Sequence, residues 1–169
     1  MNDDIKITLL NTWHTRATRA SLAHYFQAES CARVHFWLSI FNLLAAISVL
    51  YLANSTTTSG YVSIAGLLVV LSTAAHYVLK FDEKAHDHKS AGNEFTWIKR
   101  KIEVKLTKGE VSESDLQDIK RDYDHTSRNH SMVMRSTWKK ISRRVDEANA
   151  ENESFFKTSL QNGTNTPSS

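Results

Sequence analysis

The sequence predicts an all-α membrane protein, in which a two-span transmembrane helical hairpin carries a cytoplasmic antiparallel helical stem. Two apolar stretches, residues 35–53 and 61–79, contain no Asp, Glu, Lys or Arg. The 169-residue chain has one proline and five glycines, and this scarcity of helix breakers favours long helices over a turn-rich β fold. After the second stretch, apolar residues recur every three or four positions, as they do on one face of a helix.

The overall composition hides this division. Hydrophobic residues make up 41% of the chain and charged residues 23%, values that would also suit a soluble protein. The net charge of +3 is too small to indicate nucleic-acid binding, and we expect no binding to DNA. Basic residues beside apolar spans instead favour a lipid bilayer with an anionic surface as partner. Cys31 is the only cysteine, which excludes an internal disulfide and a multi-cysteine metal site.

Residues 1–33 are predicted to form a cytoplasmic N-terminal helix. The stretch 5–32 contains no glycine or proline, and Asp3 and Asp4 suit the positive end of a helix dipole. Five residues recur at helical spacing: Leu9, Trp13, Ala17, Ala20 and His24. The helix can lie on the membrane surface or pack against the rest of the cytoplasmic part, and we favour packing.

Residues 34–80 are predicted to form the transmembrane hairpin. A helix needs about 20 mostly apolar residues to cross a hydrocarbon core about 30 Å thick, and both stretches reach this length with their flanks. The alternative is a pair of buried helices in a soluble bundle. Such helices usually carry a charged face, and neither stretch has one.

The flanking charges predict the orientation of the hairpin. Residues 54–60 form a short uncharged link, which requires the spans to run antiparallel. Arg33 precedes the first span, and Lys80 and Lys84 follow the second. The positive-inside rule therefore places both termini in the cytoplasm and residues 54–60 outside.

Residues 81–148 are predicted to form the stem, an antiparallel pair of helices joined by a turn at residues 107–114. The first helix should continue from the second span without a break. The second should be one continuous helix, because its apolar stripe runs from Leu116 through Ile119, Tyr123 and Met134 to Val145. Residues 149–169 turn to Asn, Ser, Thr and Gly and are predicted to be a disordered tail.

Two motifs in the stem place a histidine three residues after a carboxylate: Glu83 with His86, and Asp122 with His125. This spacing occurs in di-metal helical bundles. If the stem folds back at residues 107–114, however, the motifs lie roughly 25 Å apart at 1.5 Å per residue and cannot share an ion within one chain. No phosphate-binding loop or nucleophile motif is present. We therefore expect a protein that is not an enzyme, without catalytic residues, cofactor or metal.

Polar residues inside the spans are the strongest functional candidates. The candidates are Ser39 and Asn42 in the first span, and Thr73 and His76 in the second; Ser48, Ser63 and Ser72 are further polar residues of the spans. Such side chains must find a partner or water, so they either fix helices together or line a pore. Two helices cannot enclose a channel, so a pore would need several protomers.

One further pair is predicted in the stem. The expected register places His130 opposite Gly92, where the absent side chain leaves room for the imidazole ring. The contact is either simple packing or a switch that responds to pH or a ligand.

The chain resembles the SLATT family of two-span membrane effectors, which occur with nucleotide-signalling genes in bacterial conflict systems. The resemblance covers residues 5–145. It rests on Trp13-x-Thr15-Arg16-x-x-x-Arg19 before the paired spans, on Lys80-x-x-x-Lys84-x-His86 with Gly92 after them, and on residues 116–123 before the last helix.

This resemblance implies a function in antiviral defence. The expected protein is a homo-oligomeric, pore-forming effector of the bacterial inner membrane that permeabilises the membrane when a sensor is triggered, causing death or growth arrest. It implies as partner a nucleotide-signalling enzyme or sensor encoded nearby, with direct nucleotide binding as a further option. The alternative from the residues themselves is a non-catalytic anchor that recruits a cytoplasmic partner through the stem.

Overall fold

The computed structural model describes residues 3–53, 59–109 and 111–163, and these residues form five helices without a strand. The helices are α1 (Asp3–Ala53), α2 (Ser59–Leu79), α3 (Phe81–Lys108), α4 (Glu113–Asn129) and α5 (Arg135–Gly163). The prediction of an all-helical protein is therefore confirmed. Most of the predicted outside loop, residues 54–60, lies outside the described residues.

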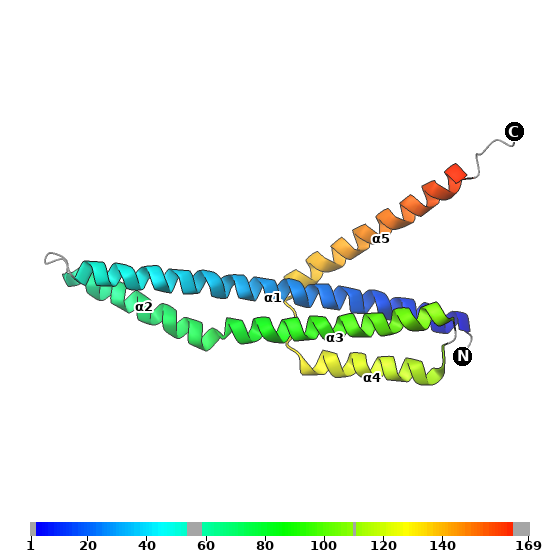
Figure 1. Cartoon of the computed structure of the whole chain (residues 1–169), viewed down its shortest axis with the longest axis horizontal. Helices are drawn as coiled ribbons and strands as arrows, with labels where there is room; N and C mark the ends of the chain where they lie inside the picture. The colour runs from blue at the N-terminus through cyan, green and yellow to red at the C-terminus, as the bar shows by residue number, and fades with distance from the viewer. Residues whose placement is uncertain (1–2, 54–58, 110, 164–169) are drawn as a thin grey trace.

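Helix α1 joins the two regions of the molecule. It has 51 residues, which at about 1.5 Å per residue corresponds to a length of about 76 Å. Its sequence contains no glycine or proline, so nothing interrupts its backbone hydrogen bonds. The predicted N-terminal helix and first span are thus two halves of one helix (Figure 1).

The second half of α1 and helix α2 are long and apolar enough to cross a membrane. They lie side by side and antiparallel (Figure 1). The most apolar window of each is 0% buried inside the protein, which is the exposure of a lipid-facing surface and not that of a soluble core. Leu50 and Val78, for example, are 73% and 74% exposed.

A break separates α2 from α3 at Lys80, where the sequence predicts an uninterrupted helix. Lys80 has φ 46° and ψ 48°, a left-handed conformation that costs an L-residue about 1–2 kcal/mol. Backbone hydrogen bonds from Lys80 N to His76 O (3.3 Å) and from Lys84 N to Lys80 O (3.1 Å) continue on either side. The chain therefore changes direction at the predicted end of the membrane-spanning region.

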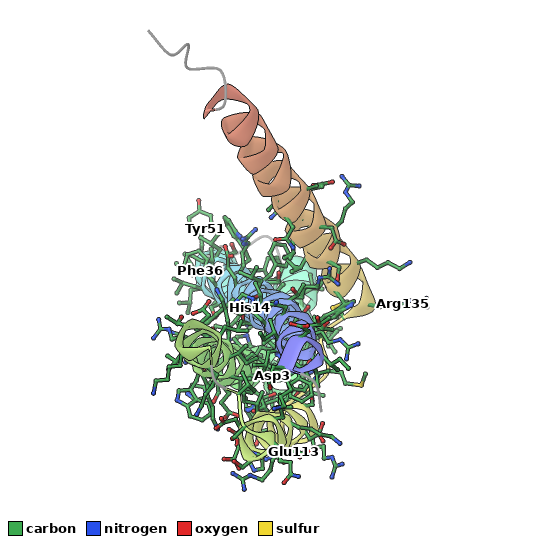
Figure 2. All side chains as sticks on the ribbon, turned by 90° about the vertical axis from the view of Figure 1, so that its right-hand side faces the viewer. Asp3, His14, Phe36, Tyr51, Glu113 and Arg135 are labelled. Atoms are coloured by element: carbon green, nitrogen blue, oxygen red, sulfur yellow. The ribbon has the colours of Figure 1, made fainter. Side chains whose placement is uncertain are left out.

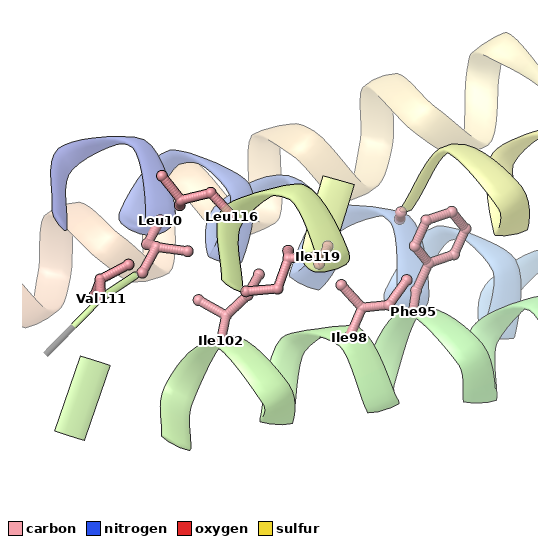
Figure 3. Packing of buried hydrophobic residues seen from close by; sticks show 9 residues of the cluster. Leu10, Phe95, Ile98, Ile102, Val111, Leu116 and Ile119 are labelled. Atoms are coloured by element: carbon pink, nitrogen blue, oxygen red, sulfur yellow. The ribbon is translucent and has the colours of Figure 1, made fainter. Parts of the chain in front are cut away.

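The core of the stem lies between α1, α3 and α4 (Figure 3). The largest fully buried side chains are Leu10 of α1, Ile98 and Ile102 of α3, and Ile119 of α4. The N-terminal half of α1 thus packs against the stem helices α3 and α4, as favoured from the sequence, and does not lie apart from them.

The turn between α3 and α4 has a defined cap on each side. Gly109 ends α3 with φ 71°, a conformation that glycine adopts without steric cost. Ser112 begins α4 in a capping box with Asp115, in which each side chain accepts a hydrogen bond from the other residue's backbone N–H. Ion pairs Lys101–Asp122 and Lys105–Asp115, both at 2.7 Å, fix α3 and α4 antiparallel.

The prediction of one continuous second stem helix is wrong, because this part of the chain forms two helices, α4 and α5. Residues 130–134 are not helical, and the first part of α5 then packs on α1 instead of α3, while its C-terminal part projects away from the other helices (Figures 1 and 2). Thr137 donates a hydrogen bond to Gln27 (2.9 Å), and Arg19 pairs with Asp146, so α5 runs antiparallel to α1.

The predicted disordered tail also differs, since α5 continues to Gly163. The sequence from Arg135 to Asn162 has no proline or glycine, so nothing local ends the helix despite its polar composition. Residues 164–169 lie outside the described residues.

Replacing Ile98 with alanine tests the three-helix core. Ile98 is 1% exposed, so the cavity left by Ile98→Ala should lower the free energy of unfolding by about 2–5 kcal/mol. Denaturant unfolding in detergent, followed by circular dichroism, measures the loss. Val104→Ala on the same helix is the control: Val104 is 53% exposed, and its change should stay within about 0.5 kcal/mol. Equal losses would contradict this core.

Candidate functional site

A polar cluster fastens the non-helical link between α4 and α5 to helix α3. His130, at the start of the link, lies between two carboxylates of α3: its Nδ1 is 2.8 Å from Asp87 Oδ1, and its Nε2 is 3.0 Å from Glu94 Oε1. The backbone N–H of Ser131 donates to Asp87 Oδ2 (3.0 Å), and Thr126 donates to Glu94 Oε2 (2.9 Å). These contacts explain why α4 ends where it does.

The geometry gives His130 a positive charge. A carboxylate only accepts hydrogen bonds, so a ring bonded to one on each side must donate from both nitrogens. Burial disfavours the charged ring, but the hydrogen bonds to Asp87 and Glu94 outweigh burial and raise the pKa of His130. Burial likewise opposes ionisation of Asp87, and its bonds with His130 and Ser131 prevail and lower the pKa of Asp87 to about 2.

A pair of buried histidines lies close by in the interior. The pKa values of these two rings are lowered, whereas that of His130 is raised. His24 Nδ1 of α1 and His88 Nδ1 of α3 are 3.2 Å apart, and both residues are buried. One nitrogen must donate and the other accept, so at least one of the two rings is neutral. Burial, reinforced by neighbouring His88, lowers the pKa of His24 to about 4, and burial also lowers the pKa of His88.

A cavity of about 470 Å³ lies beneath the link, within the range of small-molecule sites. Its walls come from α1, α3, α4, the link and α5. They include aromatic, imidazole and guanidinium groups: His24, Phe95, Tyr123, His130, Arg135 and Trp138. The cavity therefore lies where α4, the link and α5 meet α1 and α3.

The space over Gly92, where the sequence predicts the His130 ring, holds a different side chain. An added Cβ there would lie 3.1 Å from ring atoms of Tyr25 of α1, so it is Tyr25 that occupies the space. The Tyr25 hydroxyl donates to Asn93 Oδ1 (2.7 Å). His130 does lie against α3 near the predicted register, between Asp87 and Glu94, but α1 covers the face of α3 that carries Gly92, so Tyr25 and not His130 lies over this glycine.

The four predicted polar residues of the spans fall into two groups. The Ser39 and Thr73 hydroxyls donate to carbonyls of their own helices, those of His35 (3.0 Å) and Val69 (2.8 Å), and both residues are exposed. Asn42 Oδ1 and His76 Nδ1 are instead buried and have no hydrogen-bond partner within the described part of the chain.

Two further residues, beyond the four candidates, share this second property. Ser72 Oγ and His35 Nδ1 are likewise buried without a partner among the described residues. The rings of His35 on α1 and His76 on α2 lie 4.5 Å apart between centroids, so at least these two meet where the spans pack together.

The predicted membrane-flanking basic residues lie at the stem ends of the spans and interact locally. Arg33 pairs with Glu29 at 2.7 Å, and Lys80 pairs with Glu83 at 2.8 Å. The Lys84 ammonium lies 6.0 Å from the centroid of the Phe81 ring.

The two carboxylate-x-x-His motifs remain apart in the structure. Glu83 pairs with Lys80, whereas Asp122 pairs with Lys101 and His125 contacts Asn129. In the ranges that the structure describes, no group of three or more His, Cys, Asp or Glu side chains is arranged to hold a metal ion.

Comparisons of the chain with protein-family models, curated proteins and solved structures give no match.

Replacing His130 with glutamine tests the fastening of the link. His130→Gln removes the positive charge between Asp87 and Glu94 and should cost about 1–3 kcal/mol of stability. Because the folded-state pKa is raised, this contribution is complete below the ordinary value of 6.5 and is lost as pH rises through the folded pKa. The loss, measured by denaturant unfolding, should therefore be larger at pH 6 than at pH 9. His125→Gln on exposed α4 surface is the control, and equal effects of the two variants would contradict the assignment.

Acidification should act through His24 in the opposite sense. Its folded-state pKa lies below the ordinary 6.5, so stability is lost as pH falls from about 6.5 towards about 4. Thermal unfolding followed by circular dichroism should show a lower midpoint at the acidic end of this range. His24→Asn, which can still bond to His88, should show a smaller fall. An unchanged pH dependence in His24→Asn would exclude this role.

Proposed function

We propose that the chain is a membrane effector of a bacterial antiphage or conflict system, which oligomerises and permeabilises the inner membrane when a cognate sensor or nucleotide signal is triggered. In this proposal both termini lie in the cytoplasm and the stem receives the signal. Cell death or growth arrest follows from loss of the membrane barrier.

The observation that carries the proposal is the continuity of α1. The same helix contributes Leu10 to the stem core and Leu50 to the exposed apolar surface of the spans. A change in how α1 packs in the stem therefore moves the first span as well. The break at Lys80 supports the same idea, because it allows α2 to change its angle to α3.

Assembly is required because one hairpin cannot surround a pore. Asn42 Oδ1 and Ser72 Oγ are buried without partners in the described residues. In a bilayer, an unsatisfied polar group costs several kcal/mol. Rotation of the spans in an oligomer would give such groups water or a neighbouring protomer as partner.

The second candidate is a membrane anchor that recruits a cytoplasmic partner. It is favoured by the apolar side chains exposed on and beside the link: Met132 is 93% exposed, Met134 60% and Trp138 39%. Methionine-rich surfaces adapt to the shape of a binding partner. This candidate needs the link surface and not the polar groups of the spans.

Replacing Asn42 with leucine separates the two candidates. The protein is induced in bacterial cells, with and without the neighbouring signalling gene, while uptake of a membrane-impermeant dye and membrane potential are recorded. If Asn42 supports a permeation path, Asn42→Leu should abolish dye uptake at unchanged protein level. Ser48→Leu is the matched control, because Ser48 is exposed on the same helix and its hydroxyl bonds to Leu44 O.

Dye uptake that persists in Asn42→Leu would exclude the proposed role of Asn42. Unchanged permeability of cells with the native chain in both backgrounds would overturn the pore proposal. Loss of activity in Met132→Ser and Met134→Ser, with Asn42→Leu fully active, would instead support the anchor.

A further inference from the structure

We propose that His35 and His76 form a binding site for one divalent transition-metal ion at the cytoplasmic end of the two spans. The site joins α1 to α2. It does not depend on the proposed permeabilising activity, because its argument rests on the geometry of the histidine pair.

The two imidazoles are arranged as a pair of ligands. Their ring centroids are 4.5 Å apart and their planes are tilted by 55°. Two imidazoles bound to one tetrahedral Zn²⁺ at about 2.0 Å hold their centroids roughly 5 Å apart. The rings therefore need only a small adjustment to share an ion.

The two Nδ1 atoms make no hydrogen bond within the described residues. Nδ1 of His35 and Nδ1 of His76 are both buried and lack a hydrogen-bond partner there. By contrast, the stem pair His24 and His88 satisfies its Nδ1 atoms by a mutual hydrogen bond of 3.2 Å. A buried polar atom without a partner is costly, and an ion coordinated by both nitrogens removes this cost at both sites.

The donor atoms define the class of ion. Imidazole suits Zn²⁺, Cu²⁺ and Ni²⁺, whereas Ca²⁺ and Mg²⁺ prefer oxygen ligands. The pair supplies two ligands, which leaves the remaining coordination positions to water or another small ligand. The nearby cations do not oppose binding strongly, since Arg33 pairs with Glu29 and Lys80 with Glu83.

The position gives the site a structural consequence. His76 lies four residues before the left-handed Lys80, and its carbonyl accepts the Lys80 N–H. An ion held by His35 and His76 would clamp α2 to the continuous helix α1 just before α2 gives way to α3.

Zinc titration of the purified full-length protein tests the proposal. Isothermal titration calorimetry in detergent, with a non-thiol reductant to keep Cys31 reduced, should show Zn²⁺ binding by the native chain. A site with two histidine ligands on one scaffold binds an ion roughly 10²–10⁴ times more tightly than a single histidine does. His35→Gln and His76→Gln should therefore each weaken zinc binding roughly a hundredfold. His86→Ala, which removes an exposed histidine of α3, is the control and should bind as the native chain does.

A second measurement keeps the test valid if the glutamine variants do not fold. In the native chain, Zn²⁺ should protect His35 and His76 from diethyl pyrocarbonate labelling, read by mass spectrometry, and should leave His86 labelled. Native-like zinc affinity in folded His35→Gln and His76→Gln, or unchanged labelling of His35 and His76, would overturn the site.

Discussion

The close packing of α1 on α3 is the contact on which the rest of the structure depends. Both helices bury small residues: Ala17, Ala20, Ala23 and Ala28 on α1, and Ala91 and Gly92 on α3. Small side chains let two helix backbones approach closely, and Tyr25 then fits over Gly92. With α1 and α3 fixed, α4 covers one side of the pair through Leu116 and Ile119, and α5 docks on the other side of α1.

Much of the fold can be read from local features of the sequence. The uncharged runs give the apolar helices, and Gly109 with Ser112 gives the turn between α3 and α4, because each of these signals acts over a few neighbouring residues. The stripe through Ile98, Ile102, Leu116 and Ile119 gives the stem core for the same reason. Asn42 and His76 were found as polar residues in apolar runs, which is also a local signal.

The remaining features depend on contacts between distant residues. The helical spacing continues through residues 130–134, but α4 ends at Asn129, where Asp87 and Glu94 of α3 bind the next residue, His130. These carboxylates are seven residues apart and share a helix face, but nothing local pairs them with a histidine that lies 43 residues after the first and 36 after the second. His35 was missed in the same way, since only the packing of α2 on α1 brings it to His76.

The unbroken backbone of α1 has a consequence for the energetics of the whole chain. A rigid helix shared by two environments couples them, and such coupling is reciprocal: a partner that changes the tilt of α1 from the stem is itself bound more or less tightly when the bilayer changes that tilt. Hydrocarbon thickness alters the tilt of a spanning helix at a modest free-energy cost per ångström. If the apolar half of α1 crosses a bilayer, lipid composition would therefore act on the distant stem as an effector.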